Sequence, residues 1–371
     1  MKVSISKYLL SEGLGYVSRI STSKATTPIL ECCLLSTRDG GLVLSANDLE
    51  SAIETNPIES EIVENGAVAI DLKVFGDIVR SLPGPAVEIS VDDKNLATIK
   101  SGKAEFKILG MDAAEFPEFP QVVKNQGYKI NSLTLKNMVR QTVFSVATDN
   151  SKPVLCGQLL DISNDGTIKV VAVDGFRISL RQAALEEGEY KDAKIVISGK
   201  TMNEVSKILP ADADAVTTFY CSDQHVLFDL ENCTVVSRLL EGEFVSYENM
   251  FTSESTTIAT VSREEILESI DRATLISRDT KKNPVKFKIE NSNIGISTNA
   301  ELGASYEEVS ILQDGPDLEI AFNPRYLTDV MKVLDGDKII ISFTSSLSPC
   351  IITLEGSEDY KYLILPLRLR G

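Results

Sequence analysis

Two aspartates and a single histidine are the residues of this chain whose types could do chemistry. Asp48 and Asp174 each follow a short apolar run, at equivalent places of a repeated pattern. Carboxylates there could hold a metal ion for hydrolysis, but such sites need several convergent ligands, usually including histidine. The one histidine, His225, stands beside another apolar run. We interpret both aspartates as turn formers at strand ends, with a metal-dependent hydrolase as the weaker alternative. We expect no catalytic residue, no metal and no cofactor.

Cysteine is the second residue type that could do chemistry. No two cysteines have the C-x-x-C spacing of zinc or redox sites, and two adjacent cysteines lie in an apolar, strand-like run. We therefore expect buried free thiols in a reducing cytoplasm. The polar start of the chain predicts no signal peptide, and the lack of a run of 18 apolar residues predicts no membrane span. The cysteines are Cys32, Cys33, Cys156, Cys221, Cys233 and Cys350.

The elements that position these residues form a threefold repeat. The apolar run before Asp174, residues 168–173, resembles residues 42–47 and, more weakly, residues 294–299. In each third a proline follows a predicted helix, and these three prolines are 125 and 131 residues apart. The last leucines of the second predicted helices, Leu82, Leu209 and Leu334, are 127 and 125 residues apart. A chain of 371 residues has room for three such domains, which we place at 1–121, 122–251 and 252–371.

Each repeat contains two predicted helices among predicted strands. Helical periodicity or capping signals mark residues 5–20, 71–82, 133–147, 199–209, 262–276 and 324–334. Ser262 and Glu265 have the spacing of a capping box. We also predict strands directly after Pro28, Pro153 and Pro284, and at 338–343, 350–354 and 362–365. This order predicts an α+β fold in which every repeat packs two helices on two antiparallel sheets.

Charge is distributed unevenly along the chain. The net charge is −17, which by itself argues against binding to nucleic acid. The six predicted helices together carry a net charge of +3, and residues 133–147 contain Lys136 and Arg140 without any acid. Positive helices in an acidic protein favour one face for a polyanion, although lysine and arginine also simply favour helix surfaces. Further cations are Lys200, at the start of its predicted helix, and the loop residues Lys24, Arg278, Lys281 and Lys282.

Three features together resemble the bacterial beta sliding clamp family, the processivity subunits of replicative DNA polymerases. They are the three tandem copies, the sequence Asp-Gly-Phe-Arg at 174–177, and the ending Leu-Ile-Leu-Pro-Leu-Arg-Leu at 363–369. The resemblance implies the DNA clamp fold and a homodimer that closes head to tail into a ring. The helices would line the hole around double-stranded DNA, and the contacts would be independent of base sequence.

The resemblance also implies a partner-peptide cleft between the second and third repeats. Replicative polymerase, clamp loader and repair proteins would insert short hydrophobic peptides there. Leu155, Leu365 and Pro366 would anchor the peptide, and Arg177 and Tyr326 would supply polar contacts. Residues 363–367 could alternatively be an ordinary edge strand. The implied cleft residues are Leu155, Val173, Gly175, Phe176, Arg177, Ile178, Val245 and Met250 on one wall, and Asn323, Tyr326, Leu347, Pro349, Leu363, Ile364, Leu365, Pro366, Leu367, Arg368 and Leu369 on the other.

Two further sets of residues follow from the same resemblance. The dimer interface would place Phe106 and Ile108 against Leu275 and Ile276 of the second copy. Lys103 would face the acids Glu301, Glu307 and Glu308. The DNA contacts that the resemblance implies are Lys24, Asn150, Lys152, Lys200, Arg278, Lys281 and Lys282, and the positive helix adds Lys136 and Arg140.

One other function class is compatible with this composition. An acidic scaffold protein made of β-rich repeats would show the same repeat and the same negative charge, without topological linkage to DNA. The cytosolic pattern of cysteines and the expected absence of a signal peptide argue against it.

Overall fold

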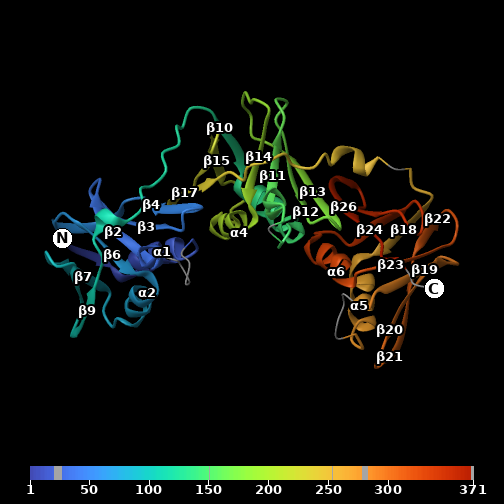
Figure 1. The fold of residues 1–371 in the computed structure, drawn as a ribbon, viewed down its shortest axis with the longest axis horizontal. Coiled ribbons are helices and arrows are strands. Elements are labelled where there is room, and N and C mark those ends of the chain that lie inside the picture. The colour runs from blue at the N-terminus through green and yellow to red at the C-terminus, as the bar shows by residue number, and fades with distance from the viewer. Residues whose placement is uncertain (21–26, 150, 253, 278–282, 369–371) are drawn as a thin grey trace. The chain divides into compact units, whose positions relative to one another are not determined.

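The computed structural model describes residues 1–20, 27–149, 151–252, 254–277 and 283–368. Its chain forms two compact units (Figure 1). The first contains residues 1–133 and 204–239, and the second contains residues 134–203 and 240–371. The limits of both units fall inside the middle third of the chain, so neither unit coincides with a sequence repeat.

The first unit is built on a 13-stranded sheet whose strands pair antiparallel throughout. β17 pairs with β4 in this sheet, which joins strands of the second repeat to strands of the first. β2 (Cys32–Arg38) pairs with β3 and with β6 (Ala67–Asp71), off the main path. The main path runs β10 (Gly127–Asn131), β15 (Val216–Cys221), β16 (His225–Asp229), β17 (Cys233–Arg238), β4 (Ser51–Thr55), β3 (Gly41–Asn47), β5 (Ile58–Glu64), β1 (Lys2–Ser6), β7 (Ala86–Val91), β8 (Leu96–Ser101) and β9 (Ala104–Leu109).

The second unit contains a nine-stranded and a four-stranded antiparallel sheet. β13 pairs with β26 in the larger sheet, which joins the second repeat to the third. Its order is β14 (Ala193–Ser198), β11 (Gly157–Ile162), β12 (Thr167–Val173), β13 (Arg177–Ala184), β26 (Ser357–Ile364), β25 (Cys350–Leu354), β24 (Lys338–Phe343), β18 (Thr257–Ser262) and β22 (Leu312–Asp314). The smaller sheet runs β21 (Gly303–Ser310), β20 (Asn293–Ala300), β19 (Val285–Glu290) and β23 (Leu318–Phe322).

Six α-helices occur in the described part of the chain, two in each repeat, as predicted. They are α1 (Lys7–Val17), α2 (Leu72–Ser81), α3 (Ser132–Arg140), α4 (Gly199–Ile208), α5 (Arg263–Ala273) and α6 (Pro324–Val333). In the first unit α1 packs on α2, and in the second unit α5 packs on α6 (Figure 1). Side-chain caps begin several of them: Ser262 accepts the N–H of Glu265 at 3.4 Å, as its spacing predicts, and Asn323 accepts the N–H of Arg325.

Two local predictions were wrong. Residues after Pro28 and Pro153 form short 3-10 helices, Pro28–Glu31 and Pro153–Cys156, before their strands begin. Proline suits the first position of a helical turn because it has no N–H to leave unpaired. The helix predicted at 133–147 ends at Arg140. The Thr142 hydroxyl donates to the carbonyl of Met138 at 2.7 Å, so the amide of Thr142 turns to Val139 instead.

Three findings bear on chemistry elsewhere in the fold. Among the described residues, no helix is both long and apolar enough to cross a bilayer. The same residues contain no group of three or more His, Cys, Asp or Glu side chains placed to hold a metal ion. All six cysteines are free thiols; four are buried, whereas Cys156 and Cys221 are half-buried.

Candidate functional site

Asp174, one of the two aspartates at equivalent places of the repeat, stabilises the turn after β12. Asp174 Oδ1 accepts the N–H groups of Phe176 at 2.9 Å and Arg177 at 3.0 Å. Gly175 occupies the left-handed region, with φ of +88°, where an L side chain would be strained. The turn leaves Phe176 56% exposed and directs Arg177 into the protein.

The first repeat contains the same turn with a different residue at its strained position. Asp48 Oδ1 accepts the N–H groups of Glu50 and Ser51, at 3.2 and 2.8 Å. Leu49, with φ of +71°, takes the place of Gly175. Both aspartates therefore form turns, and their geometry agrees with the interpretation that needs no metal.

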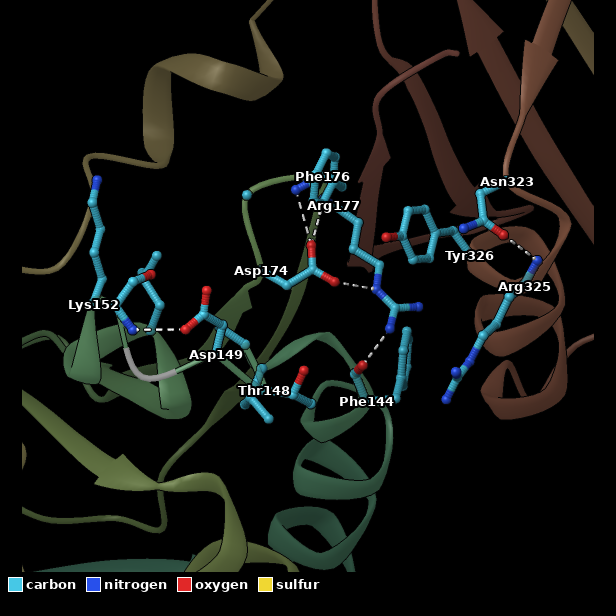
Figure 2. A pocket seen from close by; sticks show the side chains of 15 residues that line it. Phe144, Thr148, Asp149, Lys152, Asp174, Phe176, Arg177, Asn323, Arg325 and Tyr326 are labelled. Carbon is cyan, nitrogen blue, oxygen red and sulfur yellow. Dashed lines mark hydrogen bonds and ion pairs between the residues drawn. The ribbon is translucent and has the colours of Figure 1, made fainter. Parts of the chain in front are cut away.

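Arg177 is almost fully buried and uses its guanidinium entirely within the protein (Figure 2). Its Nε donates to Asp174 at 3.0 Å and its Nη2 to the carbonyl of Phe144 at 2.5 Å, as Figure 2 shows. Its Nη1 donates to Asp329 at 2.7 Å. The guanidinium carbon also lies 5.1 Å from the ring centre of Phe144 and 4.5 Å from that of Tyr326. Arg177 thus links the turn after β12 to the segment after α3 and to α6.

A pocket of about 550 Å³ opens beside this cluster. Phe176 and Tyr326 form an aromatic wall, with their rings stacked at 6.3 Å. Burial, and then the nearby Asp174 carboxylate, raise the pKa of Tyr326, so its hydroxyl stays protonated at neutral pH. Among the residues predicted for the cleft, those that line the pocket are Leu155, Gly175, Phe176, Arg177, Asn323 and Tyr326.

An apolar cluster continues from the inner wall of this pocket into the second unit. Leu155 belongs to it together with Val173, Ile178 and Leu363. Val245 packs against its edge. The cluster therefore brings together predicted cleft residues that lie far apart in the sequence, and it makes the pocket apolar on its inner side.

The C-terminal segment, residues 365–368, runs extended across the second unit and is held there by two backbone hydrogen bonds. The N–H of Leu365 donates to the carbonyl of Phe176 at 2.9 Å, and the N–H of Leu367 donates to the carbonyl of Ala321 at 2.8 Å. Leu365 remains partly exposed, so its side chain is available to a ligand. Residues 357–364 are strand β26, which is paired on both sides, so they are no edge strand.

The remaining predicted cleft residues are dispersed. Ile364 lies in the core of the third repeat, so it cannot contact a ligand in the pocket. Met250 and Leu347 are exposed, Pro349, Pro366 and Leu367 are half-buried, and Arg368 is exposed. Leu369 lies outside the described residues. The pocket also contains side chains that the prediction did not place in the cleft: Phe144, Val146, Ala147, Thr148, Asp149, Ser151, Lys152, Asp174 and Arg325.

The predicted DNA contacts differ in how far they are available. Lys152 and Lys200 are exposed, and Lys136 is half-buried. Arg140 is engaged with Asp335, since its Nη2 lies 2.9 Å from both carboxylate oxygens. A phosphate would have to compete with that carboxylate. Lys24, Asn150, Arg278, Lys281 and Lys282 lie outside the described residues.

The predicted interface residues lie on or near two edge strands, one in each unit. β9, at one end of the 13-stranded sheet, carries a partly exposed Phe106 and a half-buried Ile108, and Lys103 is exposed just before it. β21, at one end of the four-stranded sheet, carries Glu307 and Glu308. Glu307 accepts hydrogen bonds from Arg272 at 2.8 and 3.1 Å. Nearby, Leu275 and Glu301 are exposed, and Ile276 is half-buried.

Comparison with known proteins covers the whole chain. Three family models match in order: DNA polymerase III beta subunit, N-terminal domain, at residues 1–120; central domain, at 129–246; and C-terminal domain, at 248–368. The beta sliding clamp of Bacillus subtilis is 35% identical, covering 99% of this chain and 100% of that protein. The beta sliding clamp of Halalkalibacterium halodurans is 31% identical over the same shares.

Solved structures give the same result. The crystal structure of the DNA polymerase sliding clamp from Bacillus subtilis matches with a TM-score of 0.95, at 34% identity, over 100% of both chains. The DNA polymerase III beta subunit from Thermotoga maritima matches with a TM-score of 0.91, at 28% identity, again over 100% of both. The predicted fold of three similar clamp domains is therefore confirmed. The chain belongs to the DNA polymerase III beta subunit family, the beta sliding clamps.

Proposed function

We propose that this protein is a DNA sliding clamp that encircles duplex DNA and tethers the replicative polymerase. The observation that carries the proposal is the match of all three beta-subunit domains, in order, over the whole chain. A clamp holds its DNA by topology, so its contacts can be weak and independent of sequence, and no catalytic group is needed. It would act as a processivity factor and not as an enzyme, and it would work in the cytoplasm. Its three domains would be residues 1–121, 122–251 and 252–371.

The ring would form from two copies joined head to tail through β9 of one and β21 of the other. Both strands lie at sheet ends, and an exposed edge presents unpaired backbone groups to a second strand. Lys103, just before β9, would face the acids Glu307 and Glu308 of β21, whereas Lys107 of β9 is already paired with Glu105 of the same strand. Phe106, Ile108, Leu275 and Ile276 would form the apolar part of the interface.

The pocket beside Arg177 would receive short hydrophobic peptides of the polymerase and of other replication and repair proteins. It is supported by an apolar inner side, by the aromatic wall of Phe176 and Tyr326, and by the partly exposed Leu365. Its polar rim includes Lys152, Asn323 and Arg325. The buried Arg177 would shape the pocket floor, and the peptide would not replace its existing hydrogen bonds.

Retention on DNA tests the topological claim. The protein is loaded by its clamp loader onto nicked circular plasmid or onto the same plasmid linearised, and free protein is removed by gel filtration at high salt. We expect retention on the circle and escape from the open ends. Equal, salt-sensitive binding to both forms would contradict the proposal and favour an acidic scaffold that touches DNA only at its surface.

A further inference from the structure

The connection that follows β17 is tied to the second repeat by a buried tyrosine. Tyr247 is only 2% exposed, and its hydroxyl donates to Asp161 Oδ2 at 2.6 Å. Lys194 Nζ lies 3.0 Å from the same carboxylate oxygen and 3.3 Å from Glu248. Burial, and then the hydrogen bond to Asp161, raise the pKa of Tyr247, so the hydroxyl remains a donor. The buried Asp161 carboxylate thus accepts two charge-assisted hydrogen bonds, one from Tyr247 and one from Lys194.

The tyrosine ring belongs to the apolar cluster beneath the pocket. Tyr247 packs there with Leu155, Val173 and Leu363. Its neighbours along the chain, Phe244, Val245 and Phe251, are half-buried and pack against the same cluster. Residues 244–251 are therefore coupled to the apolar wall of the pocket by apolar packing, and Tyr247 adds a polar contact to that packing.

The first repeat contains the same local structure without these polar groups. The sequence Pro-Ile-Leu-Glu-Cys-Cys-Leu-Leu-Ser at 28–36 aligns with Pro-Val-Leu-Cys-Gly-Gln-Leu-Leu-Asp at 153–161, which places Ser36 opposite Asp161. Cross-strand pairing places Ala67 beside Ser36, as it places Lys194 beside Asp161. Glu-Phe-Pro-Glu-Phe at 115–119 aligns with Glu-Phe-Val-Ser-Tyr at 243–247, so Phe119 corresponds to Tyr247.

The comparison separates what the fold needs from what the second repeat adds. Ser36, Ala67 and Phe119 line one open pocket of the first unit. Within the described part of the chain, the buried Ser36 Oγ has no hydrogen-bond partner. The fold therefore accepts a serine, an alanine and a phenylalanine at these three places. The aspartate, lysine and tyrosine occur in the repeat that forms the candidate peptide pocket.

We propose that Asp161, Lys194 and Tyr247 form a polar anchor that positions residues 244–251 against the apolar wall of the peptide cleft. This inference rests on the proposed function of that cleft. The anchor residues do not touch the peptide; they hold Val245 and the packing around Leu155 in the arrangement that receives it. Without the anchor the connection retains its apolar contacts but loses the hydrogen bond of Tyr247 to Asp161 and the ion pair of Glu248 with Lys194, which are directional.

Two variants and one control test the anchor. Tyr247→Phe removes only the hydroxyl. The triple variant Asp161→Ser, Lys194→Ala and Tyr247→Phe installs the first repeat's set and leaves no buried carboxylate without its partners. Tyr190→Phe is the matched control, because it removes another tyrosine hydroxyl of the second repeat, one that donates to the carbonyl of Glu186 at 2.8 Å.

The probe is a fluorescein-labelled pentapeptide that alternates serine and leucine and ends in phenylalanine. Its extended form presents the leucines to one wall, and its aromatic end suits the Phe176 side. Fluorescence anisotropy gives the Kd, hydrogen exchange reports the amides of residues 244–251, and thermal unfolding reports stability.

We expect Tyr247→Phe to raise the Kd about 3- to 10-fold and to speed exchange across 244–251, while Tyr190→Phe leaves both unchanged. The triple variant should recover thermal stability but keep the weakened Kd, which separates positioning from folding. If the wild-type protein binds the probe and the triple variant binds it with the same Kd, the anchor is overturned while the proposed cleft stands. Failure of the wild-type protein to bind the probe would overturn the cleft, and the anchor with it.

Discussion

The guanidinium of Arg177 lies 4.5 Å from the ring centre of Tyr326, so a residue of β13 stacks on a residue of α6 inside the second unit. The same guanidinium donates to the Asp329 carboxylate, one helical turn beyond Tyr326. A strand of the second repeat and a helix of the third are thereby joined at the floor of the candidate cleft.

Arg177→Lys should be costly although it keeps the charge. Lysine cannot reproduce the planar, three-sided hydrogen bonding to Asp174, Asp329 and the Phe144 carbonyl, and it stacks less well on Tyr326. We expect a loss of about 2–3 kcal/mol in the free energy of unfolding, measured by urea titration. Arg325→Lys is the control: its side chain is largely exposed, and its change should stay within about 0.5 kcal/mol. Equal effects of both substitutions would show that Arg177 does not join β13 to α6.

Leu49→Gly should stabilise the protein. Leu49 is 65% exposed and holds φ of +71°, where a branched side chain is strained, and Gly175 occupies the equivalent turn. Relief of that strain should exceed the entropic cost of glycine, for a net gain of about 0.5–1 kcal/mol in urea unfolding. The reciprocal Gly175→Ala should cost about 1 kcal/mol, since its Cβ meets nothing within 4 Å and only the backbone is strained. A loss of stability in Leu49→Gly would mean that the leucine makes contacts worth more than the strain.

Deletion of residues 365–371 should abolish peptide binding and leave the dimer intact. The deletion removes the backbone hydrogen bonds of Leu365 to Phe176 and of Leu367 to Ala321. It also removes the partly exposed Leu365 side chain. We expect the Kd for the pentapeptide probe to rise at least about 10-fold by anisotropy. Size-exclusion chromatography with light scattering measures the dimer, and loss of both properties together would show that the cleft has been misplaced.

Phe106→Arg should convert the dimer to monomer. It places a charge on the partly exposed apolar position of β9, where the proposed ring buries Phe106 against a second copy. Sedimentation at micromolar concentration measures the association. Val63→Arg changes a well-exposed apolar residue of β5 in the same unit and should leave the dimer unchanged. A dimer that persists in Phe106→Arg would exclude β9 from the interface.

Stability should fall as pH rises above about 9. Burial raises the pKa of the Cys233 and Cys350 thiols to about 12, while in the unfolded chain both ionise near their ordinary value. The unfolded state therefore binds fewer protons above that value, and each thiol lowers the free energy of unfolding by about 1.36 kcal/mol per pH unit. Urea unfolding at pH 8, 9 and 10 under reducing conditions gives the slope. It should be shallower in a Cys233→Ala, Cys350→Ala variant; an identical slope would assign the effect to other groups.

The periodic parts of the fold could be predicted from the sequence. Helical spacing found all six helices and placed the ends of all but α3 within a few residues, because an amphipathic pattern records which face is buried. The ends were less predictable. The early end of α3 depends on one hydroxyl of Thr142, and the 3-10 turns at Pro28 and Pro153 depend on the residues next to each proline. Such short-range competition leaves no periodic trace.

The candidate site could be predicted only in part. Residue matching named Arg177 and Tyr326, but it treated Arg177 as a contact for the ligand, and the structure shows it buried among groups of its own chain. Phe144 and Asp329, which complete that cluster, were missed because they follow or lie within helices and look like ordinary core and surface positions. The spacing of Arg325 and Asp329, four residues apart on a helix, was the one local signal available.

The strand pairs β17–β4 and β13–β26 have a consequence for how this protein can be divided. A fragment cut at the limits of a sequence repeat would leave one edge of β4, or residues 177–181 of β13, without a pairing strand. Unpaired edges of this kind pair with strands of other molecules. Isolated repeats should therefore aggregate instead of folding alone. The protein should unfold in cooperative units that are set by strand pairing and do not coincide with the three sequence repeats. The strand pairs between neighbouring repeats, and not the limits of the repeats, would then decide where the chain can be divided.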